Sequence, residues 1–232
     1  MITFKTGNIF TSECNTIVNT VNCYGVMGAG IALEFKLRYP KMFTKYTEFC
    51  HSKTLSLGKL WLYRESESRF DFQSVLLFPT KNHWKEPSEM QSIELGLKKF
   101  VDVYQNLNIR SIAFPLLGVG HGGLDKEEVK RLMVKYLEDL DITVEIWGFD
   151  PTAHDDIYPN IKQDIANKSE AALSQHWGLS ISKTRSVAKL FNNQKINSLA
   201  GLLAQKGMGE KTISKLVEAY AVQNSTQQEA LF

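Results

Sequence analysis

Residues 110–147, RSIAFPLLGVGHGGLDKEEVKRLMVKYLEDLDITVEIW, decide the fold class of this chain. The apolar runs over 111–114 and 142–147 have the length and the β-branched and aromatic content of strands. Between them, Asp125 and Glu128 form a capping-box pattern that predicts the start of a helix. The apolar residues that follow recur at helical spacing: Val129, Leu132, Met133, Tyr136, Leu137 and Leu140. Strand, helix and strand in this order form a βαβ unit with parallel strands, so the fold class is α/β.

More elements of both kinds lie outward from this unit. Four further apolar runs read as strands, over residues 2–4, 17–21, 60–63 and 74–78. Ser88 and Gln91 form a second capping-box pattern ahead of an apolar stripe at helical spacing. A third helix is predicted over residues 29–38, with Pro40 just beyond its end. Residues 1–151 are therefore expected to form one domain, a mixed sheet covered by helices.

The rest of the chain has a different pattern. A chain of 232 residues is about one and a half typical domains. Turn-forming and polar residues over 152–160 predict a linker, and residues 161–222 predict a small all-helical domain. Its helices are expected over 161–177, 183–191, 197–205 and 210–221, and the polar residues 223–232 are expected to fray.

Composition and charge exclude several classes of protein. No apolar run approaches the length of a membrane span, and the N-terminus does not resemble a signal peptide. Cys14, Cys23 and Cys50 are too few for a disulfide scaffold and lack a partner at zinc-ligand spacing, so a cytoplasmic protein with reduced thiols is expected, without a metal. Residues 1–155 carry a net charge of −1 and residues 156–232 carry +3, which suggests an anionic partner for the tail.

Two glycine-rich loops each follow a predicted strand and precede a helix, over residues 22–30 and 115–125. Glycine lets the backbone approach a ligand closely, so that successive N–H groups converge on a phosphate. Two such loops favour a diphosphate over a single phosphate. Neither contains a P-loop motif, and although Gly118, Gly120 and Gly123 satisfy GxGxxG, the acidic residue and further strands of a Rossmann dehydrogenase are missing.

A cationic side chain follows the strand that ends at Phe78, in the run FPTKNHW over 78–84. Ligands of open α/β sheets bind at the carboxyl ends of the strands, so Lys81 is expected in the same crevice as both loops. A lysine there can hold a phosphate, protonate a leaving group, or attack an anomeric carbon. Trp84 either stacks on a base or covers the sheet edge.

Five stretches of the first domain resemble, in order, those of a macrodomain: Thr6–Ile9, Ile17–Asn22, Gly25–Ala32, Phe78–Trp84 and Gly118–Asp125. The resemblance is specifically to the macrodomain of the DarG antitoxins and covers about residues 1–150. It implies a three-layer fold that binds ADP-ribose and needs no cofactor. It also implies an enzyme that removes ADP-ribose from DNA bases, on single-stranded DNA, after modification by a DarT toxin.

The resemblance also implies roles for individual residues. Lys81 matches the essential lysine, and Asn22 is expected to contact the distal ribose at the scissile bond. Phe149 is expected beside the adenine, and Asn8 stands where macrodomains commonly carry an aspartate for the adenine amine, although an amide is the weaker acceptor. Main-chain groups of five glycines are expected to line the diphosphate: Gly28, Gly30, Gly118, Gly120 and Gly122. The other expected contacts to ADP-ribose are Ile9, Asn19, Ile31, Val119 and His121, and those to the base are His83 and Trp84.

Two of these residues have a second interpretation from their own context. His121 lies inside the second glycine loop, where it either serves as a base or phosphate donor or faces solvent as a variable loop residue. Lys81 either stabilises or protonates the departing base as an ammonium group, or forms a transient adduct as a free amine. The first role of Lys81 is preferred.

The tail contains a helix, a Gly-x-Gly turn and another helix over residues 202–216. This resembles a helix-hairpin-helix motif, in which backbone N–H groups hold a DNA phosphate, with Lys206, Lys211 and Lys215 suitably placed. A plain helical hairpin that packs on its neighbours is the alternative. The tail does not resemble the larger toxin-binding domain of DarG proteins, so a DarT-like toxin is expected to be opposed by enzymatic reversal.

The sequence thus leads to a hydrolase that acts on ADP-ribosylated DNA bases. A non-catalytic reader of ADP-ribose and a hydrolase of ADP-ribosylated protein or of a free ADP-ribose derivative are the alternatives. The lysine at the anomeric end favours the enzyme, because a reader has no need of a cation there.

Overall fold

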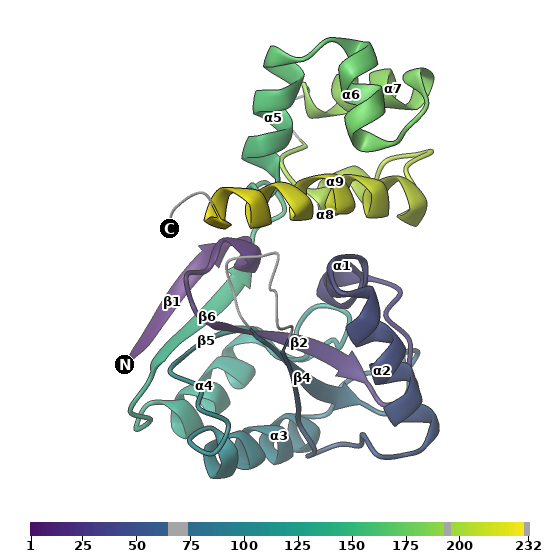
Figure 1. Cartoon of the computed structure of the whole chain (residues 1–232). Helices are drawn as coiled ribbons and strands as arrows, with labels where there is room; N and C mark the ends of the chain where they lie inside the picture. The colour runs from purple at the N-terminus through teal and green to yellow at the C-terminus, as the bar shows by residue number, and fades with distance from the viewer. Residues whose placement is uncertain (65–73, 193–195, 230–232) are drawn as a thin grey trace. The chain divides into compact units, whose positions relative to one another are not determined.

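The computed structural model describes residues 1–64, 74–192 and 196–229, and for 221–229 it describes the backbone only. The chain divides into two compact units, Met1–Phe149 and Asp150–Phe232, which are described separately below (Figure 1).

The first unit is built on a mixed sheet, and its described strands lie in the order β1-β6-β5-β2-β4-β3. All five pairs but one are parallel, since only β3 runs antiparallel to its neighbour β4. Each of the strands expected from the sequence is present, and the βαβ unit is confirmed by the parallel pairing of β5 with β6. The strands span Ile2–Gly7 (β1), Thr16–Asn22 (β2), Trp61–Arg64 (β3), Ser74–Lys81 (β4), Ser111–Pro115 (β5) and Thr143–Phe149 (β6).

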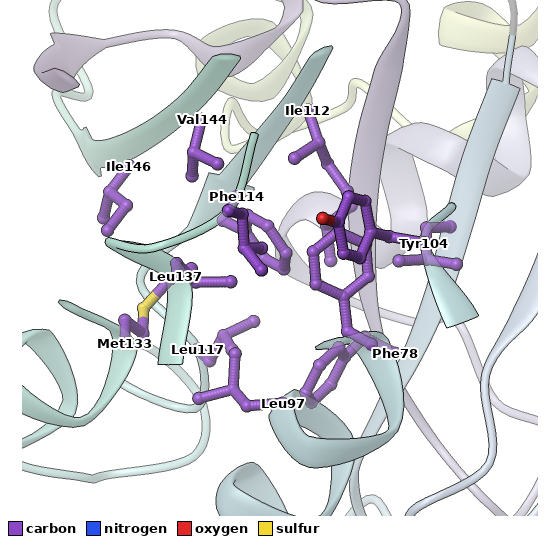
Figure 2. Close-up of a cluster of buried hydrophobic side chains, with 14 of the residues drawn as sticks. Phe78, Leu97, Tyr104, Ile112, Phe114, Leu117, Met133, Leu137, Val144 and Ile146 are labelled. Carbon is purple, nitrogen blue, oxygen red and sulfur yellow. The ribbon is translucent and has the colours of Figure 1, made fainter. Parts of the chain in front are cut away.

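One face of the sheet is covered by the helices α3 (Met90–Val103) and α4 (Lys126–Leu137), which pack against each other. Side chains alternate between the faces of a strand, so every second residue of the central strands enters this layer. The result is an apolar core between sheet and helices, shown in Figure 2. It contains, among others, Val18, Leu76, Phe78, Leu97, Ile112, Phe114, Met133 and Val144.

The opposite face carries the alternate residues of the same strands and is covered by a short 3₁₀ helix, η1 (Ile9–Thr11), and by α1 (Gly30–Arg38). Phe10 of η1 packs against Phe35 of α1, with ring centroids 5.0 Å apart, and the Arg38 guanidinium lies 4.0 Å above the Phe10 ring. A following helix, α2 (Pro40–His51), packs on α1. Layers on both faces give the three-layer α/β architecture that was expected.

Of the two capping patterns in the sequence, one is confirmed and the other is not. Asp125 caps α4 as predicted, because its side chain accepts hydrogen bonds from the Glu127 and Glu128 amides. Ser88 does not cap α3, because this helix begins after Glu89 and has no side-chain cap. The Ser88 hydroxyl is instead buried against the second glycine loop, next to Gly122. The helix α2 was not predicted, although Pro40 at its first position is a common helix start.

The second unit consists, in the described residues, of the helices α5 (Tyr158–Asn167), α6 (Glu170–Trp177), α7 (Ile181–Phe191), α8 (Leu199–Leu203) and α9 (Glu210–Glu229). The expected helix over 161–177 is two helices, because Ser169 caps a new start at α6. The core of the second unit includes Trp177, whose indole N–H donates to the Tyr220 hydroxyl at 2.8 Å. No described helix is long and apolar enough to span a membrane.

Residues 152–160, expected to form a linker, are instead folded into the second unit. The Asp155 side chain is fully buried, and its carboxylate accepts hydrogen bonds from the Ile157, Tyr158 and Leu199 amides. A buried carboxylate with this many amide donors joins the start of α5 to the start of α8. At the other end, α9 continues to Glu229, through most of the expected frayed tail, and residues 230–232 lie outside the described part.

Candidate functional site

The predicted site residues gather at one edge of the sheet because five of its strands are parallel. The carboxyl ends of β1, β6, β5, β2 and β4 lie side by side in that order. Asn8 follows β1, Phe149 ends β6, the second glycine loop follows β5, and the first follows β2, while Lys81 ends β4. With a strand spacing of about 4.8 Å, these ends span about 19 Å.

An irregularity in the pairing sets the position of Lys81. Val21 of β2 pairs with Pro79 of β4, whereas the next residue, Asn22, pairs with Lys81. The residue skipped is Thr80, whose hydroxyl donates to the Val21 carbonyl at 3.4 Å. A bulge of this kind re-aims the side chains that follow it. It brings the two residues predicted to act at the scissile bond opposite each other.

The Lys81 amine joins two loops. Its Nζ donates to the carbonyl oxygen of His121 at 2.7 Å, in the second glycine loop, and to that of Glu86 at 2.9 Å, in the loop after β4. Burial lowers the pKa of the Lys81 amine from its ordinary value. Two carbonyl acceptors leave one further direction at the nitrogen, occupied by a proton in the ammonium form or by the lone pair in the free amine.

Asn22 holds the first glycine loop in shape. Its Oδ1 accepts hydrogen bonds from the amides of Tyr24, Gly25 and Val26, and its Nδ2 donates to the Val26 carbonyl at 2.6 Å. The buried Tyr46 hydroxyl donates to the Asn22 carbonyl at 2.7 Å. The expected role of this side chain was contact with the distal ribose, but here most of its hydrogen-bonding capacity goes to the loop.

The two glycine loops meet at Gly30 and His121. A Cβ on Gly30 would lie 3.1 Å from the His121 imidazole, and Gly30 has a φ of +55°, in the left-handed region that favours glycine. The His121 ring therefore lies against the first loop, next to the start of α1. The ring is also exposed, so its role within the site remains a prediction.

Gly122 is the most tightly enclosed glycine of the second loop. A Cβ there would lie 2.2 Å from the Gly118 carbonyl oxygen and 2.4 Å from the Ser88 hydroxyl, whereas Gly120 has open space around it. The Ser88 amide also donates to the Gly122 carbonyl at 2.9 Å. Gly122 thus shapes the loop, whereas Gly120 and Gly123, which have open space around them, are glycines that a ligand can approach.

Three aromatic rings lie beside Lys81. Tyr24 contacts His83 edge-on, with centroids 4.4 Å apart, and His83 stacks on Trp84 at 5.6 Å. Tyr24 is 56% exposed and Trp84 47%, and the Lys85 ammonium lies 5.0 Å from the Trp84 ring. These residues form an exposed aromatic cluster, Tyr24, His83 and Trp84. Tyr24 was not among the predicted site residues; an aromatic side chain inside a glycine-rich loop was its only signal.

The carboxyl ends of the parallel strands form a row, and β1 and β6 lie at the end of this row away from Lys81. Phe149 pairs with Gly7, next to Asn8, and it is 65% exposed, which suits a ring that flanks a bound base. The Asn8 oxygen accepts the Phe10 amide at 3.1 Å and so caps η1. An acceptor already used in this way is a poor partner for an adenine amine. Ile9 is buried in η1.

The structure separates some predicted residues from the row. Asn19 lies within β2, fully buried beside Met27, so its side chain does not reach the surface. Three other predicted residues stay with the glycine loops: Gly28 is exposed, and Ile31 and Val119 are partly buried. Lys206, Lys211 and Lys215 belong to the second unit. In the described part of the chain, no cluster of His, Cys, Asp and Glu side chains is arranged to hold a metal ion.

Comparison with known proteins agrees with this geometry. Residues 18–133, half of the chain, match the Macro domain family. The DNA ADP-ribosyl glycohydrolase of Mycobacterium tuberculosis is 38% identical over 181 residues, which cover 78% of this chain and 48% of that protein. The chain therefore spans about half the length of this curated relative.

Solved structures point to the same family. The macrodomain of Mycobacterium tuberculosis DarG is 42% identical, with a TM-score of 0.61, and the match covers 63% of this chain and 97% of that one. Thermosipho africanus DarTG in complex with ADP-ribose is 38% identical, with a TM-score of 0.59, over 63% of this chain and 42% of that one. The chain belongs to the macrodomain family, and its first unit is similar to the macrodomain of DarG.

Proposed function

We propose that this protein hydrolyses the bond between ADP-ribose and a DNA base and so reverses the modification made by a DarT-like toxin. The observation that carries the proposal is Lys81, a partly buried amine held between the second glycine loop and the loop after β4, at the carboxyl edge of a macrodomain sheet. The 42% identity to the macrodomain of DarG supports the same substrate class.

ADP-ribose binds along the row of strand ends in this proposal. The adenine lies at the ends of β1 and β6 beside the exposed Phe149 ring. The diphosphate lies over the exposed backbone of Gly28, Gly30 and Gly120, where N–H groups and the start of α1 favour negative charge. The distal ribose then lies at β2 and β4, next to Lys81.

Lys81 assists the departure of the base. Cleavage of an N-glycosidic bond passes through an oxocarbenium-like state, in which the base leaves with its electron pair. The ammonium group donates its third N–H to the leaving base while two carbonyl oxygens fix its direction. Water adds to the anomeric carbon and loses a proton, which restores the ammonium form of Lys81 directly or through solvent. The lowered pKa makes the proton easier to transfer than that of an ordinary lysine. The alternative is that the free amine attacks the anomeric carbon and water later releases the adduct.

The exposed aromatic cluster gives the base a place to bind. Bases stack on aromatic side chains whatever their sequence, and an unpaired base can reach such a surface. Tyr24, His83 and Trp84 lie on the Lys81 side of the row, where the base must leave, and Lys85 adds a cation for the neighbouring phosphate. The cluster therefore favours a single-stranded DNA substrate.

In this proposal the antitoxin role rests on the chemistry of the Lys81 site. The chain covers about half of its curated relatives, and its second unit is a small helical one. In this proposal, protection by enzymatic reversal uses the site of the first unit and modified DNA, and a cytoplasmic location is part of the proposal.

The test is to incubate the protein with a single-stranded oligonucleotide that a DarT-type transferase has modified, and to follow the adduct on a gel. Wild type and Lys99→Ala, a matched exposed lysine on α3, are expected to remove the adduct. Lys81→Ala is expected to be slower by at least about 100-fold. Binding without release would identify a reader, and release from modified protein but not from DNA would identify a protein hydrolase; either result overturns the proposal.

A further inference from the structure

The second unit contains two helical hairpins of the same construction. In the first, α6 ends at Gly178, which has a φ of +60°, and Leu179 is buried before α7 begins. In the second, Gly207 has a φ of +83°, and Met208 is buried before α9 begins. Each hairpin thus turns at an exposed glycine in the left-handed region and is anchored by the apolar residue that follows it.

Each hairpin is tied to the other by a lysine. Lys183 of α7 donates to the Gly207 carbonyl at 2.9 Å, and Lys215 of α9 donates to the Gly178 carbonyl. The helices pair in the same reciprocal way, since α6 packs on α9 and α7 packs on α8. Exchanging the two hairpins therefore leaves the pattern of contacts unchanged, which is the mark of an approximate two-fold relation.

Charge within the second unit is divided along the chain. Residues 150–170 carry a net charge of −3, whereas residues 178–215 carry +6. The lysines nearest to the hairpins are Lys183, Lys206, Lys211 and Lys215, and the only carboxylate within residues 178–215 is Glu210. Lys206 and Lys211 are exposed, and a Cβ on Gly207 or Gly209 would meet nothing within 4 Å, so the backbone there is open to a ligand.

We propose that the two hairpins together form one binding surface for the backbone of a DNA duplex, each hairpin holding a phosphate of one strand. Lysine ammonium groups and backbone N–H groups are the usual partners of DNA phosphates. The two strands of a duplex are related by local two-fold axes, so a surface with an approximate two-fold relation suits a duplex better than a single strand. Lys183 and Lys215 each retain donors beyond the one that binds a carbonyl.

The experiment measures binding of the full-length chain to a short, unmodified, fluorescent DNA duplex by anisotropy, between about 50 and about 200 mM salt. If four lysines each neutralise one phosphate, the affinity falls by about 100-fold over this range. Because the duplex carries no ADP-ribose, the result does not depend on the hydrolase proposal.

Three variants change the net charge equally. Ile181→Glu with Ser182→Glu alters the first hairpin, Lys211→Glu alters the second, and Lys189→Glu lies at the far end of α7 as the control. Carboxylates in the first turn of a helix stabilise it, so the hairpin variants are expected to fold, which thermal unfolding by circular dichroism checks. Both hairpin variants are expected to bind the duplex at least about 10-fold more weakly, and Lys189→Glu within about twofold of wild type.

Unchanged duplex binding by either hairpin variant overturns the proposal, since one hairpin would then be sufficient. The proposal also fails if the wild type binds single strands as tightly as the duplex, or binds neither at about 50 mM salt. Equal losses in all three variants would mean that net charge alone controls binding, which contradicts a site at the hairpins.

Discussion

Asn22 of β2 and Lys81 of β4 are register partners across a bulge, with Thr80 as the extra residue. The Cys23 amide extends this link, since it donates to the carbonyls of Lys81 and Asn82 at 3.0 and 3.1 Å. The first glycine loop and the strand that carries the reactive amine are therefore one connected structure. Substitutions in the first glycine loop are therefore expected to change the position of Lys81 even where the substituted residue does not contact the substrate.

Asn22→Ala tests this connection. Removal of the Asn22 side-chain amide leaves the backbone amides of Tyr24, Gly25 and Val26 without their shared acceptor, so the loop loosens. Binding of free ADP-ribose, measured by calorimetry, is expected to weaken by at least about 10-fold. Limited proteolysis is expected to cut within residues 22–30 more rapidly. The exposed neighbour Asn82→Ala is the control and should behave as wild type; a loop in the variant as resistant to protease as in wild type would argue for direct ribose contact instead.

Gly122→Ala and Gly120→Ala separate loop shape from ligand approach. The added methyl group collides with the Gly118 carbonyl and the Ser88 hydroxyl at position 122, but meets nothing within 4 Å at position 120. Gly122→Ala is expected to lower the free energy of unfolding by about 1–3 kcal/mol in urea denaturation. Gly120→Ala should unfold as wild type yet bind ADP-ribose more weakly. Equal stability of the two variants would show that Gly122 is not enclosed.

The pH dependence of the reaction distinguishes the two roles of Lys81. Burial lowers the pKa of this amine, so its proton is lost at a pH below the ordinary value of 10.5. If the ammonium form assists the leaving base, the rate is constant at lower pH and falls as pH rises through the lowered pKa. Lys81→Arg keeps its charge at all accessible pH values, so its residual rate should lack this alkaline limb. A rate that rises with pH, or an ADP-ribosyl adduct on Lys81 found by mass spectrometry during turnover, would establish the nucleophile instead.

Trp84→Ala tests whether the aromatic cluster binds the substrate base. Loss of one stacking ring is expected to cost about 1–3 kcal/mol, which raises the KM for modified single-stranded DNA by about 5- to 150-fold. The affinity for free ADP-ribose, which lacks the base, should stay within about twofold of wild type. Leu95→Ala, an exposed apolar residue on α3, serves as the control. If Trp84→Ala weakened the binding of modified DNA and of free ADP-ribose equally, Trp84 would contact ADP-ribose or stabilise the fold, and would not act as a stacking surface for the base.

Acid stability is expected to depend on Glu145, a buried carboxyl group of β6. Burial raises the pKa of this carboxyl, but hydrogen bonds from Lys5, Ser12 and Trp147 outweigh it and leave the pKa below its ordinary value of 4.5. The contribution to stability is therefore full above about pH 4.5 and is lost as pH falls through the lowered value. Glu145→Gln should unfold more readily at pH 7 and lose less stability than wild type between about pH 7 and about pH 3. If wild type and Glu145→Gln lost the same free energy of unfolding over this pH range, Glu145 would not be the group that controls acid stability.

Local patterns were sufficient for much of the fold. Apolar runs with β-branched and aromatic residues marked the strands, and the spacing of Asp125 and Glu128 marked the start of α4, because such preferences act within a few residues of the chain. Ser88 shows where this fails: the same spacing is present, yet burial against Gly122 withdraws its hydroxyl from the helix start. Tertiary packing overrode a local preference there.

The sequence by itself predicted that both glycine loops, Lys81 and Phe149 follow strands and so share one edge of the sheet, although β4 and β6 in fact continue to Lys81 and Phe149. Three features depended on tertiary structure: the bulge that sets Asn22 opposite Lys81, the carbonyl partners of the amine, and the pairing of the Gly178 and Gly207 hairpins through Lys183 and Lys215. Each of them joins residues far apart in the chain or depends on a one-residue slip in register. Local periodicity cannot encode such pairings, because their free energy comes from contacts that exist only once the chain is packed.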